Sequence, residues 1–490
     1  MKKWILSLVM LLTAVAASAV EVEIDGLWYN IVEETGEASV IQYKNNNRYS
    51  GDIIIPEYID NGGNTYRVTN IEEWAFQFCG IDKITIPSSV ETMGKGVFAD
   101  CYNLTTVNIL SPIEIIEDQT FGSCEKLESF VIPNSVKVIG SSAFNGCKAL
   151  LSIELPNNVQ TIGAWAFAGC IGLTSVAIPN GVTIIEEGLF SGCTNLSSVS
   201  IPVGVQTIGN LAFRECVGLN TVTLPESVTS IGRYSFCECS NLSSIIIPNN
   251  VTSIGDCAFE HCAALSSVTI PEGVLSIGSE AFYFCTGLTS IEIPNSVETI
   301  GSTAFCHCDG VKTIKIGSGV LNIYNSAFAG NEQLTDVYCY AETIPSASTD
   351  VFYGSNIENA VLHVPESLIQ DYKSVEPWKN FKSIIGLNKC ATPSIIYSNG
   401  KLIFECETEG VECVATIESA DVKTHYGNEM ELTYQYKVKV YATKEGYEDS
   451  DTATYTVDCR QGALNGDVNG DGQVGIADIV NITNIMAGKE

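Results

Sequence analysis

Apolar and polar residues alternate over short stretches of the chain, and one stretch shows the pattern in full. Leu173, Val176 and Ile178 are apolar. Ser175 and Ala177 are the small residues that alternate with them. An alternation with period two is typical of a short strand with one buried face. A proline follows directly and ends the strand, because proline has no N–H to donate to a neighbouring strand.

This stretch is one unit of a repeat whose clearest marker is a phenylalanine every 23 residues. It occurs eleven times without slippage, at Phe98, Phe121, Phe144, Phe167, Phe190, Phe213, Phe236, Phe259, Phe282, Phe305 and Phe328. A cysteine follows nearly every phenylalanine by three residues, and an apolar residue follows after three more. A unit of this length cannot bury its own apolar face, so the units must stack into a continuous core. The sequence therefore predicts a mainly β solenoid.

A glycine recurs at the turn of most units, at Gly140, Gly163, Gly209, Gly232, Gly255, Gly278 and Gly301. Glycine reaches positive φ angles that other residues avoid. We therefore expect these glycines to adopt positive φ at a sharp corner. About twelve coils at roughly 4.8 Å per strand would form a slab some 60 Å long.

The repeated Leu-x-x-Val-x-Ile-Pro-x-x-Val-x-x-Ile-Gly-x-x-Ala-Phe-x-x-Cys pattern resembles the BspA-like branch of the leucine-rich repeat proteins over roughly residues 53–388. The resemblance implies a leucine-rich repeat stack. It also implies a protein on the surface of a cell, because members of that family have been linked to adhesion to host matrix proteins and to other cells.

Atypical sequence at both ends of the repeats predicts caps, because an open stack exposes strand edges and apolar core. We place an N-terminal β cap at 20–70 and the solenoid with its C-terminal cap at 71–388. After Phe328, Asn331 replaces the cysteine, and a short helix is expected over 365–372. Four aromatic residues are predicted to enlarge the core of the C-terminal cap: Tyr338, Tyr340, Phe352 and Tyr353.

The N-terminus predicts export. Residues 1–19 combine Lys2 and Lys3, an apolar run and a small-residue cleavage site that ends at Ala19, as in a signal peptide. No later stretch reaches the ~18 apolar residues that a membrane span requires. Loss of the two lysines moves the formal charge from −32 to −34. Such an acidic chain repels phosphate groups, so nucleic acid is not expected as a partner.

Nineteen cysteines in an exported protein suggest disulfides, but their spacing argues against pairing. Cysteines at one repeat position form a ladder of parallel side chains about 5 Å apart, which favours buried thiols that act as small hydrophobes. Cys237, Cys257 and Cys306 lie beside the ladder and form the close pairs Cys237/Cys239 and Cys306/Cys308, which suggest a zinc site together with His261 and Cys262. It is disfavoured because the paired cysteines fall on opposite sides of the chain turn.

Residues 389–460 change character. Ser394 to Phe404 carries a hairpin signal around a Ser-Asn-Gly turn, and alternating strands are expected at 411–417, 432–442 and 452–457. The stretch 440–447 resembles an Ig-like module of bacterial surface proteins and glycosidases. This resemblance implies a small β-sandwich that acts as a spacer.

The last segment, 461–490, carries the sharpest local chemistry. Its oxygen-bearing residues have the spacing of a calcium loop, with Gln473 contributing its backbone carbonyl: Asp467, Asn469, Asp471, Gln473 and Asp478. The aspartate at position 12 and the helix expected over 476–486 are similar to a dockerin repeat. That resemblance implies cofactor calcium and contacts from Ile476 and Ala477 to a cohesin-like module. Dockerins carry two such repeats, whereas this sequence carries one.

No enzyme constellation is visible, since the histidines His261, His307, His363 and His425 are scattered along the chain. The outward positions of the strands instead predict a hydroxyl-rich partner-binding face: Ser175, Ser198, Ser200, Thr221, Thr223, Ser244, Ser267, Thr269, Ser290 and Glu292. We interpret the chain as an extracellular or cell-surface binding protein for a protein or glycan ligand. The alternative is a structural component that docks into an extracellular complex through the calcium tail.

Overall fold

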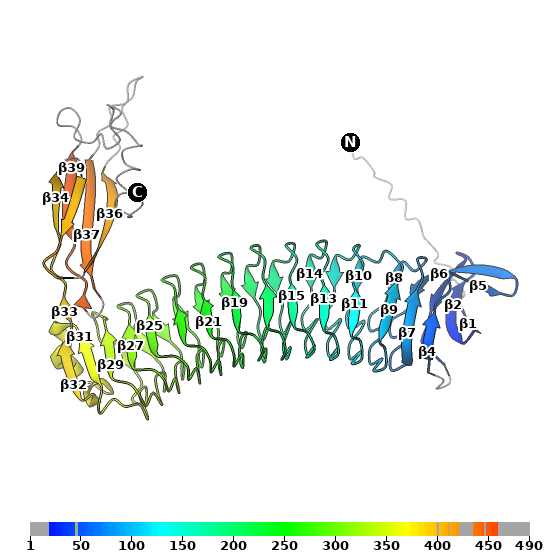
Figure 1. Ribbon diagram of the computed structural model, residues 1–490, viewed down its shortest axis with the longest axis horizontal. Coiled ribbons are helices and arrows are strands. Elements are labelled where there is room, and N and C mark those ends of the chain that lie inside the picture. Colours follow the sequence, from blue (N-terminus) through cyan, green and yellow to red (C-terminus); the bar gives the residue numbers. More distant parts are fainter. Residues whose placement is uncertain are drawn as a thin grey trace, which may run out of the picture.

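The computed structural model describes residues 19–44, 48–398, 401–409, 411–420, 435–444 and 447–458. Parallel coils stack along one axis between an N-terminal sheet and a C-terminal module (Figure 1). The N-terminal sheet contains β1 (Ala19–Ile24), β2 (Leu27–Val32), β3 (Glu37–Val40), β6 (Asn64–Ile71) and β5 (Tyr58–Asn61) in that order, and β8 (Thr92–Met93) pairs with β6. This sheet covers the first coil, as a cap must.

One strand per coil forms the first face of the solenoid, which we call the strand row. It comprises β4 (Ser50–Ile54), β7 (Gly80–Ile86), β9 (Thr106–Ile109), β11 (Ser129–Val131), β13 (Ser152–Glu154), β15 (Ser175–Ala177), β17 (Ser198–Ser200), β19 (Thr221–Thr223), β21 (Ser244–Ile246), β23 (Ser267–Thr269), β25 (Ser290–Ile293), β27 (Thr313–Ile316), β29 (Asp336–Cys339), β31 (Val361–Val364) and β32 (Ser383–Gly386). These fifteen strands of the described chain exceed the expected twelve coils, because both caps contribute strands.

A second set of two-residue strands forms the other face, which we call the back row. It comprises β10 (Ile115–Ile116), β12 (Val138–Ile139), β14 (Thr161–Ile162), β16 (Ile184–Ile185), β18 (Thr207–Ile208), β20 (Ser230–Ile231), β22 (Ser253–Ile254), β24 (Ser276–Ile277), β26 (Thr299–Ile300), β28 (Asn322–Ile323) and β30 (Ser346–Ala347). Each pairs in parallel with the strand one coil away, as Ile185 does with Ile208.

The core lies between the two rows, and the phenylalanines form its spine. From Phe76 to Phe352 each ring is buried and stacks on the next with centroids 5.0–5.8 Å apart. Leu173, Val176 and Ile178 are buried while Ser175 and Ala177 are exposed, which confirms the predicted inside and outside of the strand.

The ladder cysteines have a role beyond that of small hydrophobes. From Cys101 to Cys308, each Sγ donates a hydrogen bond to the phenylalanine carbonyl of the preceding coil at 3.0–3.3 Å. Asn331 takes over this role, since its Nδ2 donates to the carbonyl oxygen of Phe305 at 3.2 Å. All eighteen described cysteines are unpaired, and those of the ladder are buried, as their spacing predicted.

The expected reason for the turn glycines is wrong. None of the glycines from Gly140 to Gly301 named above has positive φ. Each instead lies against the backbone of the preceding coil, so that a Cβ at Gly163 would come within 2.5 Å of the Ser141 nitrogen. The positive φ angles fall two residues before and two residues after the phenylalanine, for example at Trp165 and Glu215.

The C-terminal cap contains η1 (Glu366–Leu368), α1 (Ile369–Tyr372) and η2 (Trp378–Asn380), which confirms the helix expected over 365–372. Trp378 is fully buried and meets Phe352 edge to face at 5.6 Å, so these two aromatics close the stack. Phe352 is buried, as predicted, and so is Phe381. The prediction is wrong for the three tyrosines. Tyr338 and Tyr340 are only half-buried, and Tyr353 is 78% exposed.

After the cap, three small groups of strands follow. β33 (Asn388–Lys389) pairs with β38 (Tyr447–Glu448), and β34 (Ser394–Ser398) forms the predicted hairpin with β35 (Lys401–Glu405). β36 (Glu412–Ala420), β37 (Gln435–Thr443) and β39 (Ala453–Asp458) form an antiparallel sheet. These strands stand upright at the C-terminal end of the solenoid in Figure 1. Among the described residues, none belongs to a helix long and apolar enough to cross a membrane.

Candidate ligand-binding face

The strand row places all ten predicted partner-binding side chains on one exposed face. The parallel register aligns them in two columns that run along the solenoid. In the first column Thr221 lies beside Ser244 and Ser244 beside Ser267. The same column continues to Thr313, which pairs with Ser290. The repeat thus places one hydroxyl per unit in a line along the exposed face.

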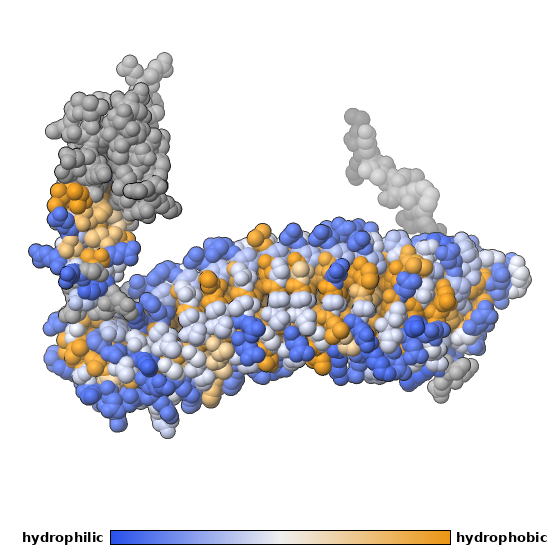
Figure 2. Space-filling model, viewed as in Figure 1, coloured by the Kyte–Doolittle hydropathy of each residue, from blue (hydrophilic) through white to orange (hydrophobic). Residues whose placement is uncertain are grey.

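The second column is less regular, and its residues differ from coil to coil. Ala177 lies beside Ser200, and the 73% exposed Ile246 lies between Thr223 and Thr269. Further along, Glu292 pairs with Lys315, whose Nζ lies 3.9 Å from the carboxylate. In Figure 2, hydrophobic and hydrophilic residues are interspersed along the solenoid. The second column therefore varies in size and charge from coil to coil, unlike the hydroxyl residues of the first column.

Hydroxyl residues just before the strands do structural work instead. Ser197 donates to the backbone oxygen of Thr174 at 3.1 Å, and Ser266 donates to that of Ser243 at 3.1 Å. Thr335 repeats this bond to Lys312 at 3.0 Å. These side chains bridge neighbouring coils, so the repeat uses one hydroxyl to hold the stack and presents the next one outward.

Aromatic residues replace the hydroxyls at the C-terminal end of the face. The rings of Tyr338 and His363 stack with centroids 4.1 Å apart, and Tyr338 also stacks on Tyr340 at 6.5 Å. Asp336 lies in the first column, and its Oδ1 is 3.0 Å from Nε2 of His363, so the carboxylate orients the histidine ring. The sequence assigned both tyrosines to the core. Both tyrosines face the exposed side because β29 and the residue after it keep the alternation of inward and outward side chains seen in the earlier strands.

A cleft of about 1090 Å³ opens at this end, between the strand row and the C-terminal module. Glu292, Lys315 and Tyr340 line it from the solenoid, whereas Tyr447 and Asp451 line it from the module. Lys444 also lines the cleft, and its Nζ lies 4.6 Å from the centre of the Tyr447 ring. No pattern in the repeats reveals this cleft, because part of its wall comes from the segment after the solenoid.

The structure separates the residues weighed for zinc. The side chains of Cys239, Cys262 and Cys308 belong to the ladder, whereas Cys237 and Cys306 are buried beside the turn, outside the ladder. This confirms that the paired cysteines point to opposite sides. The statement that the histidines are scattered is wrong for two of them, since Phe284 stacks between His261 and His307 at 5.0 and 4.7 Å.

The predicted calcium ligands Asp467, Asn469, Asp471, Gln473 and Asp478 lie outside the described residues. The same holds for Ile476, Ala477 and His425, and for residues 1–18 of the predicted signal peptide. These assignments stay predictions.

Comparisons with known proteins agree with the solenoid. The family described as BspA type leucine rich repeat region matches residues 63–174, 161–274 and 252–373. A leucine-rich repeat protein from Bacteroides ovatus is 27% identical, with a TM-score of 0.61 over 74% of this chain and 99% of that one. The pneumococcal vaccine antigen PcpA shares the fold at 19% identity, with a TM-score of 0.51 over 75% of this chain and 98% of that one. No curated protein matches the sequence.

Proposed function

Because this chain belongs to the BspA-type leucine-rich repeat family, we propose that it is a secreted or cell-surface binding protein without catalytic activity. It adheres to host matrix proteins, glycans or other cells through the strand row. The observation that carries this proposal is the line of outward hydroxyl groups, which lie side by side from Thr221 to Ser267 and again from Ser290 to Thr313.

Such a face favours distributed binding. Serine and threonine both donate and accept hydrogen bonds, but they are under-represented among the residues that dominate binding energy at interfaces. Each coil therefore contributes little, and affinity accumulates over an extended ligand that contacts many coils. A repetitive ligand such as a glycan chain or a fibrous matrix protein matches the repetition of the face.

The C-terminal end of the face supplies the anchor. Tyr338, Tyr340 and His363 offer aromatic surface, and aromatic side chains are enriched where binding energy concentrates. The neighbouring cleft adds Glu292 and Asp451, whose carboxylates accept hydrogen bonds from sugar hydroxyls or peptide amides. We infer that the ligand lies along the hydroxyl line and ends in this cleft.

The proposal is tested by a binding screen of residues 20–490 against glycans and matrix proteins. For a ligand found there, Tyr338→Ala should weaken binding at least tenfold, whereas Tyr353→Ala, an exposed tyrosine outside the strand row, should leave it unchanged. Ser244→Arg should weaken binding by obstructing the middle of the line. Equal binding by all four proteins would place the ligand elsewhere and contradict the proposal.

An alternative function rests on the tail. The spacing of Asp467, Asn469, Asp471 and Asp478 favours a dockerin-like calcium repeat, through which the chain would dock into an extracellular complex by contacts to a cohesin-like module. In that case Ile476 and Ala477 carry the partner contacts, and Ile476→Asp should abolish capture of a cohesin while leaving ligand binding at the strand row intact.

A further inference from the structure

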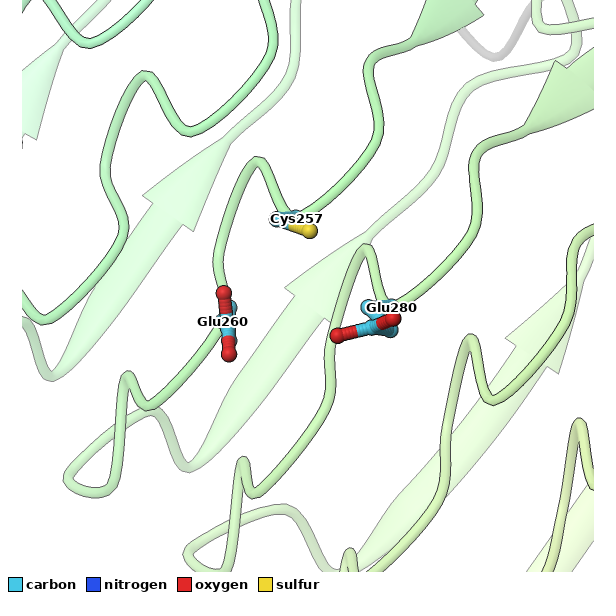
Figure 3. A group of neighbouring side chains, drawn as sticks. All are labelled: Cys257, Glu260 and Glu280. Atoms are coloured by element: carbon cyan, nitrogen blue, oxygen red, sulfur yellow. The ribbon is translucent and has the colours of Figure 1, made fainter.

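The turn surface of the solenoid gathers a thiol and two carboxylates that the binding face does not use. Cys257, Glu260 and Glu280 each bring one ligand atom to within 4.8 Å of the other two (Figure 3). The Cys257 side chain is 4% exposed, and the two glutamates are half-buried. The three groups thus lie in a partly desolvated place rather than spread over open solvent.

The repeat backbone fixes the spacing of these groups. The N–H of Glu260 donates to the carbonyl of Cys257 at 3.2 Å, so these two residues close one tight turn. Glu280 occupies the same position as Cys257 in the next coil, and both adopt positive φ, 55° and 58°. The Cys257 N–H donates to Ser279 of that next coil at 2.8 Å, which holds the two turns in register.

We propose that Cys257, Glu260 and Glu280 bind a divalent cation of the zinc class. A thiolate with carboxylates is a ligand set that zinc accepts, with bonds of about 2.3 Å to sulfur and 2.0–2.2 Å to oxygen. Three protein ligands leave a fourth position for water, as zinc sites with an open position do. Calcium and magnesium prefer oxygen ligands alone, so the sulfur selects against them.

The surroundings of the cluster favour a cation. With the thiol deprotonated, the three ligands carry three negative charges within 4.8 Å of one another. A bound divalent cation offsets this repulsion and stabilises the thiolate. Cys237 Sγ lies 3.5 Å from Glu260 Oε2, so it supports the carboxylate from the preceding coil.

The experiment is cobalt titration of the reduced full chain, because cobalt(II) replaces zinc and bonded thiolate gives a charge-transfer band in the near ultraviolet. The wild type should bind one cobalt with such a band, and zinc should displace it. Cys257→Ser should lose the band. Glu280→Gln should weaken cobalt binding at least tenfold while keeping a residual band, because its thiol remains.

Two matched variants locate the site. Cys306→Ser removes another turn thiol, and Glu238→Gln removes another turn carboxylate, yet neither residue belongs to the cluster, so both should bind as the wild type does. The Asp471→Ala variant tests whether cobalt binds in the tail. A band that persists in Cys257→Ser, or wild-type affinity in Glu280→Gln, overturns the proposal. Circular dichroism checks that each variant is folded, and Glu280→Gln decides the matter if Cys257→Ser does not fold.

Discussion

The early coils, 98–236, and the late coils, 255–364, have the same interior but different surfaces. Ring centroids are 5.4 Å apart for Phe98 and Phe121 and 5.0 Å apart for Phe282 and Phe305. The thiols of Cys124 and Cys308 reach the preceding coil at the same 3.3 Å. The repeat therefore determines the interior and leaves the surface free to differ.

The surfaces of the early coils mainly hold neighbours together. Lys148 pairs with Glu125 at 2.8 Å, one coil away, and Lys137 pairs with Glu114 at 2.7 Å. In the late coils, carboxylates instead meet a thiol at Cys257, and aromatic rings stack at Tyr338 and His363. The aromatic anchor of the proposed binding face and the proposed metal site thus lie where a coil departs from the repeat, whereas stability is expected to depend on what every coil shares.

The largest effect expected from the shared interior is alkaline unfolding. Burial raises the pKa of the eight ladder thiols from Cys124 to Cys285 above the ordinary value of 9.0, to about 12 for Cys193 and Cys239. Above pH 9 the unfolded chain loses these protons and the folded chain keeps them, so stability falls as pH rises. Each thiol contributes about 1.4 kcal/mol per pH unit.

The measurement is the free energy of unfolding between pH 8 and 10.5, followed by circular dichroism in denaturant. Cys193→Ala should make the dependence of this free energy on pH less steep by the contribution of one thiol, about 1.4 kcal/mol per pH unit. A thiol count supports the assignment, because the denatured protein without reductant should titrate at least eight more thiols than the native one. Stability that is flat across this range would show that the ladder is paired or exposed.

Truncating the phenylalanine spine has the next largest effect. Phe213→Ala and Phe282→Ala should each lower the free energy of unfolding by about 3–5 kcal/mol, because each leaves a cavity between stacked rings. Ser198→Ala, on the exposed face, should change it by less than about 0.5 kcal/mol. Equal losses in the early and late coils would sharpen the comparison, and a clear difference between the two phenylalanine variants would break it.

The sequence predicts the interior well because every coil repeats the same signal. Twenty-three-residue spacing is enough to place Phe213 inside and Ser198 outside. Prediction from sequence fails where a residue type can serve two purposes at one position. Glycine allows positive φ, and it also lets two backbones approach closely. Only the structure shows that Gly209 serves the second purpose. Tyr338 was assigned to the core by residue type, although the strand alternation around it points outward.

The candidate site divides in the same way. The hydroxyl line follows from the repeat, so its residues could be named from sequence alone. The Cys257 cluster could not, because it joins two turn positions from neighbouring coils whose residues differ in every unit. The cleft beside Tyr340 depends on how the chain returns after the cap, which no local pattern encodes.

A glycine pair within one coil gives a smaller effect. Gly209→Ala should destabilise by about 1–3 kcal/mol, because the new Cβ would lie 2.6 Å from the Ile185 oxygen. Gly204→Ala has its nearest contact at 3.6 Å and should be neutral or stabilise by up to about 1 kcal/mol. Thermal melting of both variants measures the difference. Destabilisation of equal size would mean that backbone conformation, not coil spacing, requires glycine at both positions.

The smallest effect is expected from calcium binding in the tail, outside the solenoid. It distinguishes a site of oxygen ligands from the proposed sulfur-containing site at Cys257. Four side-chain oxygens and one backbone carbonyl, with water, suit calcium at the ~10⁻⁴–10⁻³ M affinity of extracellular modules. At ten times the dissociation constant, calcium would stabilise the segment by about 1.4 kcal/mol. Asp467, Asp471 and Asp478 repel one another without a cation, so the helix expected over 476–486 should order upon binding.

Calorimetry of the full chain with calcium, followed by circular dichroism, tests the tail. The wild type should release or absorb heat and gain helix, and Asp471→Ala should do neither. Cys257→Ser should still bind calcium as the wild type does, because a thiol is a poor calcium ligand and the turn cluster lies in the solenoid. If Cys257→Ser lost calcium binding and Asp471→Ala kept it, the tail would hold no calcium site and the docking alternative would lose its basis.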